Sequence, residues 1–366
     1  MRFIENALYH EDLGTVTALP LEWETLRGRS FLISGATGMI GSTLIDVLMK
    51  LNREKSLDIR VFALGRSREK AEGRFAPYLT DERFRFLQCS INQKEDLDRV
   101  LDAALAGTGS GGYDYVFHAA SNTHPVAYAT DPIGTITTNI IGLNNLLDYA
   151  SGHGCRRFLF ASSNEIYGEN RGDAELFDEQ YCGYIDCNTM RAGYPESKRA
   201  GEALCQAYIA QKKMDVVILR FTRSFGPALL KSDTKALSQF LKKGLAGEDI
   251  VLKSEGTQFY SYTYVCDAVS GLLTCLLKGE CGEAYNIADV SCDITLRDLA
   301  KLIADFAGRQ VVFEIPDAVE QAGYSKATKA RLDSTKLQKL GWKAQFDIGT
   351  GIRHTLEILK ESEEGR

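Results

Sequence analysis

Residues 30–41 read Ser30-Phe31-Leu32-Ile33-Ser34-Gly35-Ala36-Thr37-Gly38-Met39-Ile40-Gly41, a short apolar run followed at once by closely spaced glycines. The apolar run predicts a buried parallel strand, and the apolar residues after Gly41 recur at helical spacing. In this order the glycines permit a tight turn and let a pyrophosphate approach the helix N-terminus, where unpaired N–H groups favour an anion. The loop therefore predicts a dinucleotide site built from Gly35, Thr37, Gly38, Met39, Ile40 and Gly41; a merely tight strand-to-helix connection is the alternative.

The composition is that of an ordinary soluble globular protein, with 366 residues of which 44% are hydrophobic and 25% charged. This length accommodates two domains, or one large α/β domain with a smaller lobe. The net charge of −6 and the absence of a Lys/Arg run argue against a nucleic-acid surface. Residues 1–6 carry charge where a signal peptide is apolar, and no apolar run approaches the ~20 residues of a membrane span. We expect a cytoplasmic protein with no nucleic-acid or membrane partner.

The cysteines and histidines indicate neither a disulfide framework nor a metal centre. The nine cysteines are odd in number and form no C-x-x-C pair, which is typical of reduced thiols. The five histidines are scattered along the chain, so no metal site is predicted.

Apolar runs alternate with helical patterns through the first two thirds of the chain. We expect strands over residues 30–34, 59–64, 84–88, 115–118, 158–161 and 216–219, and helices over 94–105 and 133–150. The second of these helices is expected to face the sheet with Ile136, Ile140, Leu143, Leu146 and Leu147. Such alternation predicts a doubly wound parallel (Rossmann) sheet, which binds ligands at the carboxyl ends of its strands.

The loops at those carboxyl ends supply further candidate contacts to a dinucleotide. Ser90 and Ile91 should lie near the adenine, and the small residues Ala119, Ala120 and Ser121 allow a close approach. Arg66 stands where an acidic residue would bind the ribose of NAD. It favours the 2′-phosphate of NADP or a relaxed preference, although an arginine stacked on adenine would look the same.

Three regions are expected along the chain. Residues 1–28 form a helix-and-loop extension packed on the main domain, with dimer contacts or a cover over the cofactor as the alternative. Residues 29–222 form the NAD(P)-binding domain. Residues 223–366 form mainly a smaller substrate lobe, with some segments returning to the main domain, and contain a helix over 234–247, a strand over 250–252 and a helix over 352–359.

Tyr194 and Lys198 stand four residues apart where we expect a helix to begin, so both side chains should point to one face. Pro195 suits a first helical turn, and Ala200, Leu204, Ala207 and Tyr208 continue an apolar stripe. A tyrosine that acts as a base near neutrality needs its pKa lowered by roughly three units, about 4 kcal/mol, which a neighbouring cation supplies. A solvated helix face is the alternative.

Together these motifs resemble the extended short-chain dehydrogenase/reductases of the NAD-dependent epimerase/dehydratase group, which modify nucleotide sugars. The similarity covers roughly residues 29–345. Besides the glycine loop, it rests on His118-Ala119-Ala120-Ser121, Asn139 with Ile141-Gly142, Ser163-x-Glu165-x-Tyr167-Gly168, Tyr194-x-x-x-Lys198, Arg220-Phe221 with Gly226-Pro227, Val265-x-Asp267 and Leu340-Gly341-Trp342.

The resemblance implies a catalytic role for four residues. Tyr194 would take the proton of a sugar hydroxyl while the carbon beneath it gives hydride to the nicotinamide, and Ser163 would hydrogen-bond the same oxygen. Lys198 would lower the pKa of the phenol and hold the nicotinamide ribose. NAD is the implied cofactor, with NADP left open by Gly65-Arg66, and Asn139, Ser162 and Phe221 join the residues that contact it.

The product of this step is a 4-keto sugar, whose fate defines the enzyme. Glu165 resembles the acid of 4,6-dehydratases and uronic-acid decarboxylases, although a salt-bridged supporting group would look alike. The stretch Ala119-Ala120-Ser121…Pro125…Tyr128…Asp131-Pro132-Ile133…Thr138-Asn139, together with Arg191, is especially similar to UDP-glucuronate decarboxylases. The expected function is therefore dehydration or decarboxylation of a nucleoside-diphosphate sugar. A 4-epimerase, an NADPH-dependent keto-sugar reductase and a non-catalytic scaffold are the alternatives.

Two positions depart from the family. Arg223 stands where an asparagine is usual, and Tyr260 where an arginine usually contacts the diphosphate. Arg223, Lys326, Lys329 or Arg331 are the candidates to compensate. The expected substrate contacts are Ser121, Asn164, Arg191, Arg223, Tyr260 and Arg331. The resemblance also implies a homodimer, formed by the helix over 133–150 and the Tyr194 helix.

Overall fold

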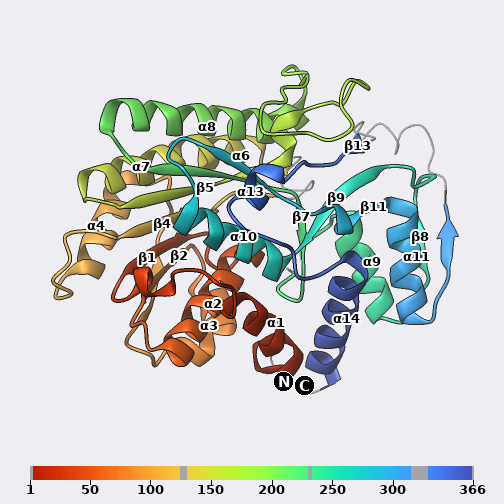
Figure 1. Cartoon of the computed structure of the whole chain (residues 1–366), viewed down its shortest axis with the longest axis horizontal. Coiled ribbons are helices and arrows are strands. Elements are labelled where there is room, and N and C mark those ends of the chain that lie inside the picture. The colour runs from red at the N-terminus through yellow and green to blue at the C-terminus, as the bar shows by residue number, and fades with distance from the viewer. Residues whose placement is uncertain (1–2, 124–129, 230–232, 315–328, 365–366) are drawn as a thin grey trace.

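A parallel sheet covered on both faces by helices forms the larger part of the molecule, and a smaller group of strands and helices lies beside it (Figure 1). The structure is a computed structural model that describes residues 3–123, 130–229, 233–314 and 329–364. Pro125, Tyr128 and Lys326, which the sequence singles out, lie outside these ranges.

Seven parallel strands make up the central sheet, in the order β10-β6-β5-β4-β1-β2-β3. Their bounds are β1 Ser30–Ser34, β2 Arg60–Gly65, β3 Phe84–Gln88, β4 Tyr115–His118, β5 Arg157–Ser163, β6 Val216–Phe221 and β10 Ala284–Ile287. The chain runs outward from β1 to β3 on one side and from β4 onward on the other. The strand order therefore reverses between β1 and β4, the place where such sheets bind ligands, and the doubly wound fold predicted from the sequence is confirmed.

Helices pack on the sheet in two layers, each with its own hydrophobic core. One layer contains α1 Ala7–Thr17, α2 Met39–Lys55, α3 Arg68–Phe75 and α10 Val265–Lys278, and the other contains α4 Lys94–Leu105, α7 Leu143–Gly152 and α8 Gly193–Lys212. Single-turn helices lie at Phe3–Glu5, Trp23–Leu26, Ala76–Tyr78, Asn164–Tyr167, Met190–Ala192 and Val290–Cys292.

Most predicted strands are close to the observed ones, and the differences have local causes. The strands β1, β3 and β4 have the predicted bounds, whereas β2 is shifted by one residue. Both β5 and β6 run further than predicted, to Ser163 and Phe221, because these residues still pair with each other in the sheet. The strand β10 was not predicted, since its Asn286 is polar; the buried amide of Asn286 accepts a hydrogen bond from the Tyr167 phenol (2.5 Å).

The prediction of one regular helix over residues 133–150 is wrong. The segment divides into α6 (Pro132–Thr137), a π-helical segment η4 (Thr138–Gly142) and α7. The extra residue of a π-helical turn rotates the faces of the helix relative to each other. Asn139 is consequently buried, whereas Ile136 is 38% and Ile141 46% exposed. Leu143, Leu146 and Leu147 face the core as predicted.

The smaller lobe is built on strand β9 (Phe259–Tyr264). It pairs with β7 Arg223–Phe225, β11 Asp293–Thr295 and β13 Lys329–Ala330. The strand β8 (Ile250–Leu252), predicted from the sequence, pairs with β12 (Val311–Phe313). Helices α9 Ala236–Leu245, α11 Leu296–Ala307, α13 Thr335–Lys339 and α14 Ile348–Glu364 complete the C-terminal half, α9 being shorter and α14 longer than predicted.

The N-terminal helix α1 packs against α2, α10 and α14, and the two termini lie close together (Figure 1). Its buried Asp12 accepts a hydrogen bond from the Tyr264 phenol (2.6 Å) and pairs with His354 (2.8 Å). These bonds join the first helix to β9 and to the last helix. Within the described ranges, no helix has the length and apolar character needed to cross a membrane.

Candidate active site

The glycine loop between β1 and α2 has the geometry of a dinucleotide cradle. Gly35 has φ +70°, and a Cβ placed on it would lie 2.7 Å from the backbone of Ala119 and Ala120. Gly38 is the N-cap residue of α2 and has no side chain to accept a hydrogen bond, so the first amides of that helix are left for another acceptor. Thr37, Gly38, Met39 and Ile40 are all partly exposed. These features fit the pyrophosphate of a dinucleotide at the helix N-terminus.

The loops that follow β2 and β3 lie next to each other at the same edge of the sheet. Arg66 is exposed, and its carbonyl accepts a hydrogen bond from the Gln88 amide (3.2 Å). Ser90 is partly exposed, whereas Ile91 is buried and lies against Gly142. No carboxylate stands at Gly65 or Arg66. The preference of Arg66 for NADP stays a prediction.

Small residues at the end of β4 leave room beside the glycine loop. Ala119, Ala120 and Ser121 are each partly exposed there. The buried His118 before them exchanges a hydrogen bond with the Ser34 hydroxyl (2.7 Å). Burial, and secondarily the charge of Lys198, lowers the pKa of His118 to about 3. This histidine is therefore neutral at physiological pH and serves to hold β1 and β4 in register.

Strand β5 and helix α8 bring the four predicted catalytic residues together. Ser163 ends β5, and Tyr194 lies in the first turn of α8; they are 8% and 7% exposed. The Ser163 hydroxyl hydrogen-bonds the Tyr194 phenol, and the charge of Glu165 also acts on it. Lys198, one turn further along α8, is 2% exposed. The spacing of Tyr194 and Lys198 therefore marks an inward helix face rather than a solvated one.

Lys198 does not acidify the phenol in the protein alone. Its Nζ donates to the Ala161 carbonyl (2.7 Å), 4.9 Å above the Phe160 ring and 6.0 Å from the Tyr194 ring centroid. Burial lowers the pKa of Lys198 to about 8. Burial also raises the pKa of Tyr194, and the hydrogen bond from Ser163 offsets this only in part. Burial therefore outweighs the other influences on the pKa of the Tyr194 phenol, and the effect of Lys198 on that pKa during the reaction stays a prediction.

Three predicted cofactor contacts lie beneath this cluster. The Asn139 amide donates to the Ser197 hydroxyl (2.8 Å), and its buried Oδ1 has no hydrogen-bond partner in the described part of the chain. Ser162 donates to Glu202 (2.5 Å), which is itself paired with an arginine of β6. Phe221 is buried at the end of β6. Ser162 is thereby bound into a protein network, whereas Asn139 keeps an acceptor unused.

Glu165 is paired with Arg191 across the entrance to the cluster. The guanidinium Nη2 lies 3.4 Å from the carboxylate, and the two side chains are 44% and 26% exposed, arginine first. Asn164, the residue before Glu165, is buried. The salt-bridged alternative for Glu165 is therefore realised, but the long and exposed pair leaves the carboxylate accessible.

Arg223 and Tyr260, the two departures from the family, lie against each other. The Arg223 guanidinium carbon is 3.7 Å from the centroid of the Tyr260 ring. Tyr260 is buried, and its pKa is raised by that burial. The charges of Arg223, Arg191 and Glu165 all act on its phenol, so the pair lies beside the catalytic cluster.

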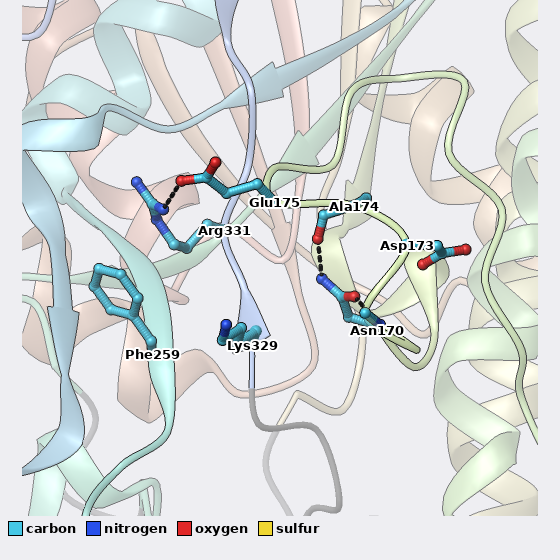
Figure 2. Close-up of a pocket in the computed structure, with 8 residues that line it drawn as sticks. Asn170, Asp173, Ala174, Glu175, Phe259, Lys329 and Arg331 are labelled. Atoms are coloured by element: carbon cyan, nitrogen blue, oxygen red, sulfur yellow. Dashed lines mark hydrogen bonds and ion pairs between the residues drawn. The ribbon is translucent and has the colours of Figure 1, made fainter.

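Arg331 lies in a separate pocket, away from Arg223 and Tyr260. It lines a pocket of about 490 Å³ with Asn170, Gly172, Asp173, Ala174, Glu175, Phe259 and Lys329 (Figure 2). Its guanidinium pairs with Asp293 (2.7 Å) and Glu175 (3.2 Å) and covers the Phe259 ring. Successive strand residues point to opposite faces, so Phe259 with Arg331 and Tyr260 with Arg223 lie on opposite faces of β9. The predicted substrate contacts are therefore divided between two places.

The described residues contain no group of three or more side chains that would hold a metal ion. Sequence reasoning had not assigned roles to Phe160, under the Lys198 ammonium, or to Ala161, whose carbonyl accepts from it. Neither leaves a distinctive sequence signal, since both are ordinary residues of an apolar strand.

Comparisons with known proteins agree with this geometry. A model described as the NAD dependent epimerase/dehydratase family matches residues 31–288. The chain is 27% identical to UDP-glucuronic acid decarboxylase 1 of Xenopus tropicalis over 333 residues, 91% of this chain and 72% of that protein.

Solved structures share the fold at lower identity. The UDP-glucose 4-epimerase of Thermotoga maritima, solved with UDP-glucose, gives a TM-score of 0.75 at 23% identity over 91% of this chain and 99% of that one. A double mutant of the dTDP-glucose 4,6-dehydratase of Streptomyces venezuelae, solved with NAD, gives 0.76 at 23% identity over 92% and 98%. These two proteins catalyse different reactions, so the structural similarity supports the fold alone. The reaction of this chain has to be inferred from its site residues.

Proposed function

Because the chain belongs to the NAD-dependent epimerase/dehydratase family, we propose that it modifies a nucleoside-diphosphate sugar through a 4-keto intermediate. The proposed outcome is 4,6-dehydration or loss of a C6 carboxylate. The observation that carries this choice is Glu165, an accessible carboxylate whose charge acts on the buried phenol of Tyr194. The decarboxylase relatives support the same choice.

The proposed cofactor site follows the carboxyl edge of the sheet, from the glycine loop past Ala119 to Lys198. NAD held there would supply the hydride acceptor, and later the hydride donor, for the sugar carbon. Lys198, with a pKa of about 8, carries its positive charge at neutral pH. Asn139 offers a buried carbonyl oxygen with no partner among the described residues. The Lys198 ammonium can donate to a ribose hydroxyl oxygen, and the Asn139 oxygen can accept from a hydroxyl or N–H group of a dinucleotide.

The catalytic roles follow from the geometry of the cluster. Tyr194 takes the C4 hydroxyl proton, and the Ser163 hydroxyl stabilises the phenolate by donating to it. Oxidation at C4 makes the C5 proton acidic and makes a C6 carboxylate a β-keto acid. Loss of carbon dioxide then leaves the C5–C6 electron pair in an enolate, which is protonated at C5 before C4 is reduced again.

Glu165 has a role in either outcome, directly in a dehydratase and through Arg191 in a decarboxylase. In a dehydratase it takes the C5 proton while water leaves from C6, and in a decarboxylase it orients Arg191 toward the sugar carboxylate. A 4-epimerase only returns the hydride to the other face, so it gives Glu165 no role. An NADPH-dependent reductase is favoured only by Gly65-Arg66, and net consumption of NADPH with a keto sugar would identify it.

The exposed apolar side chains on α6 and η4 support a homodimer. Ile133 is 76%, Ile136 38% and Ile141 46% exposed, and both elements lie against α8. On α8 itself, Ala200 and Ala207 of the predicted stripe are exposed, and Leu204 and Tyr208 are partly exposed. This face is the proposed dimer interface. The free cysteines in the described ranges are compatible with a cytoplasmic location, which we also propose.

The test is turnover of a panel of nucleoside-diphosphate hexoses and hexuronates by NAD-loaded protein. We expect release of carbon dioxide from a hexuronate or a 4-keto-6-deoxy product from a hexose. Glu165→Gln should slow product formation by ~10²–10⁴-fold while reduced nicotinamide still appears, whereas Tyr194→Phe should abolish both signals. If the wild type turns over no member of the panel, or Glu165→Gln leaves the product rate unchanged, the proposal is wrong.

A further inference from the structure

Arg223, the first residue of β7, has a charged N–H group that no described residue of the chain pairs with. Its Nη1 is buried and finds no hydrogen-bond partner among the residues that the structure describes. No carboxylate in those ranges forms an ion pair with it. A buried charged donor without an acceptor is costly, so such groups are normally paired in a folded protein or by its ligand.

The Tyr260 ring determines the orientation of the Arg223 guanidinium. In the β7–β9 ladder Arg223 lies opposite Tyr262, so its side chain shares a face with Tyr260 and Tyr262. The guanidinium lies on the Tyr260 ring at 3.7 Å. Its N–H groups lie in the plane of the guanidinium, so the ring cannot accept them all and an in-plane acceptor is still needed. The Tyr260 ring thus holds the guanidinium in an orientation from which its N–H groups can bind two oxygens of one oxyanion.

The charges around Arg223 and Tyr260 also favour the binding of an anion. Arg191 and Glu165 pair with each other, and Arg223 adds a second positive charge beside them. The cluster therefore carries an excess positive charge next to Ser163 and Tyr194. On the other face of β9 the situation differs, because Arg331 is neutralised by Asp293 and Glu175.

We propose that Arg223 is a specificity-determining residue that binds an oxyanion of the substrate, with the Tyr260 ring as the platform that orients it. This inference rests on the proposed function, which supplies two sources for the oxyanion: a carboxylate at C6 of the sugar or the diphosphate. Arg191 meets the same substrate from the side of Glu165. The pair thereby favours an anionic group where a neutral hexose offers a hydroxyl.

Binding of small probes to NAD-loaded protein, measured by calorimetry, tests this assignment. The probes are inorganic pyrophosphate, glucuronic acid 1-phosphate, glucose 1-phosphate, UDP, UDP-glucose and UDP-glucuronate. Arg223→Met should weaken binding on the order of 10- to 100-fold. Arg223→Lys, which keeps the charge without the planar fork, should recover only part of that loss. Tyr260→Leu should resemble Arg223→Lys, and Tyr260→Phe should resemble the wild type.

The matched control is Arg297→Met on α11. Arg297 also lies over a ring, 5.5 Å from the centroid of Phe313, but its Nε is satisfied by the Glu255 carbonyl (2.9 Å). The substitution Arg297→Met removes the same charge as Arg223→Met, and it should leave the affinity for every probe unchanged. Thermal melting of each variant separates a lost contact from a lost fold, and Arg223→Lys serves if Arg223→Met does not fold.

The pattern across the probes identifies the oxyanion. A loss for pyrophosphate, UDP and both UDP-sugars supports contact with the diphosphate. A loss confined to glucuronic acid 1-phosphate and UDP-glucuronate supports contact with the carboxylate. Affinities equal to those of the wild type for all probes would overturn the assignment. Because pyrophosphate and the sugar phosphates need no turnover, a protein inactive on every nucleotide sugar would refute the proposed function and still report on Arg223.

Discussion

Replacing Lys198 by methionine should stabilise the protein at neutral pH while removing its activity. Lys198 is 2% exposed, and burial lowers its pKa from 10.5 to about 8. That fall corresponds to about 3 kcal/mol of unfavourable free energy for the buried ammonium at pH 7. The unfolded chain binds this proton more tightly than the folded one. The free energy of unfolding of the wild type should therefore rise as the pH rises from about 8 toward 10.5.

Methionine fills a similar volume without the charge, so the Lys198 contribution to pH dependence should vanish in Lys198→Met. The assay is urea denaturation of both proteins at several pH values between 7 and 10.5, followed by circular dichroism. The informative quantity is the difference in unfolding free energy between variant and wild type, and its change with pH. Losing the hydrogen bond to the Ala161 carbonyl (2.7 Å) lowers the stability of the variant by an amount independent of pH, so it cancels in that change.

Between pH 7 and pH 10.5, the unfolding free energy of the wild type should rise by about 3 kcal/mol relative to that of Lys198→Met. A difference that stays constant with pH would refute the reasoning, because it would mean that Lys198 titrates alike in the folded and unfolded states. The same variant should lose affinity for NAD, measured by calorimetry. A stable, inactive protein would show that the charge is retained for function at the expense of stability.

Two further predictions test the cofactor loop and the proposed interface. Gly35→Ala should lower both the melting temperature and the affinity for NAD, because a φ of +70° is strained for alanine and the added Cβ would lie 2.7 Å from the Ala119 backbone. The control is Gly73→Ala, which should be neutral or stabilising because an added Cβ there would meet no atom within 4 Å. Equal effects of the two substitutions would contradict this explanation. Ile133→Asp should convert a dimer to a monomer in sedimentation analysis, whereas Val290→Asp, at another exposed apolar residue (58%), should not. A wild type that is already monomeric would remove the basis for that interface.

Much of the fold follows from short-range patterns in the chain. The apolar run of β1 ends at Ser34-Gly35, that of β3 at Gln88 and that of β4 at His118, so the bounds of these strands are readable in the sequence. Parallel strands joined by helices place their carboxyl ends at one edge of the sheet. For that reason the sequence predicts that Gly35 and Ser163 lie at the same edge of the sheet.

Other features depend on contacts between elements distant in sequence. The π-helical segment η4, the strand β10 and the network that holds Ser162 each involve a partner from another element. Local periodicity does not predict these features. Without their partners, the residues of η4 could form a regular helix, those of β10 could form a loop, and the Ser162 hydroxyl could remain unbound.

The doubly wound sheet and the glycine loop follow from the amino-acid sequence, and the four catalytic candidates follow from its resemblance to a family. Their electrostatics depend on packing, because burial raises the pKa of Tyr194 and lowers that of Lys198. It likewise separated Arg223 from Arg331, on opposite faces of β9. The physical reason is that residue spacing sets which face of an element a side chain occupies, whereas pKa values and pairing depend on the solvent excluded and the charges brought near by packing.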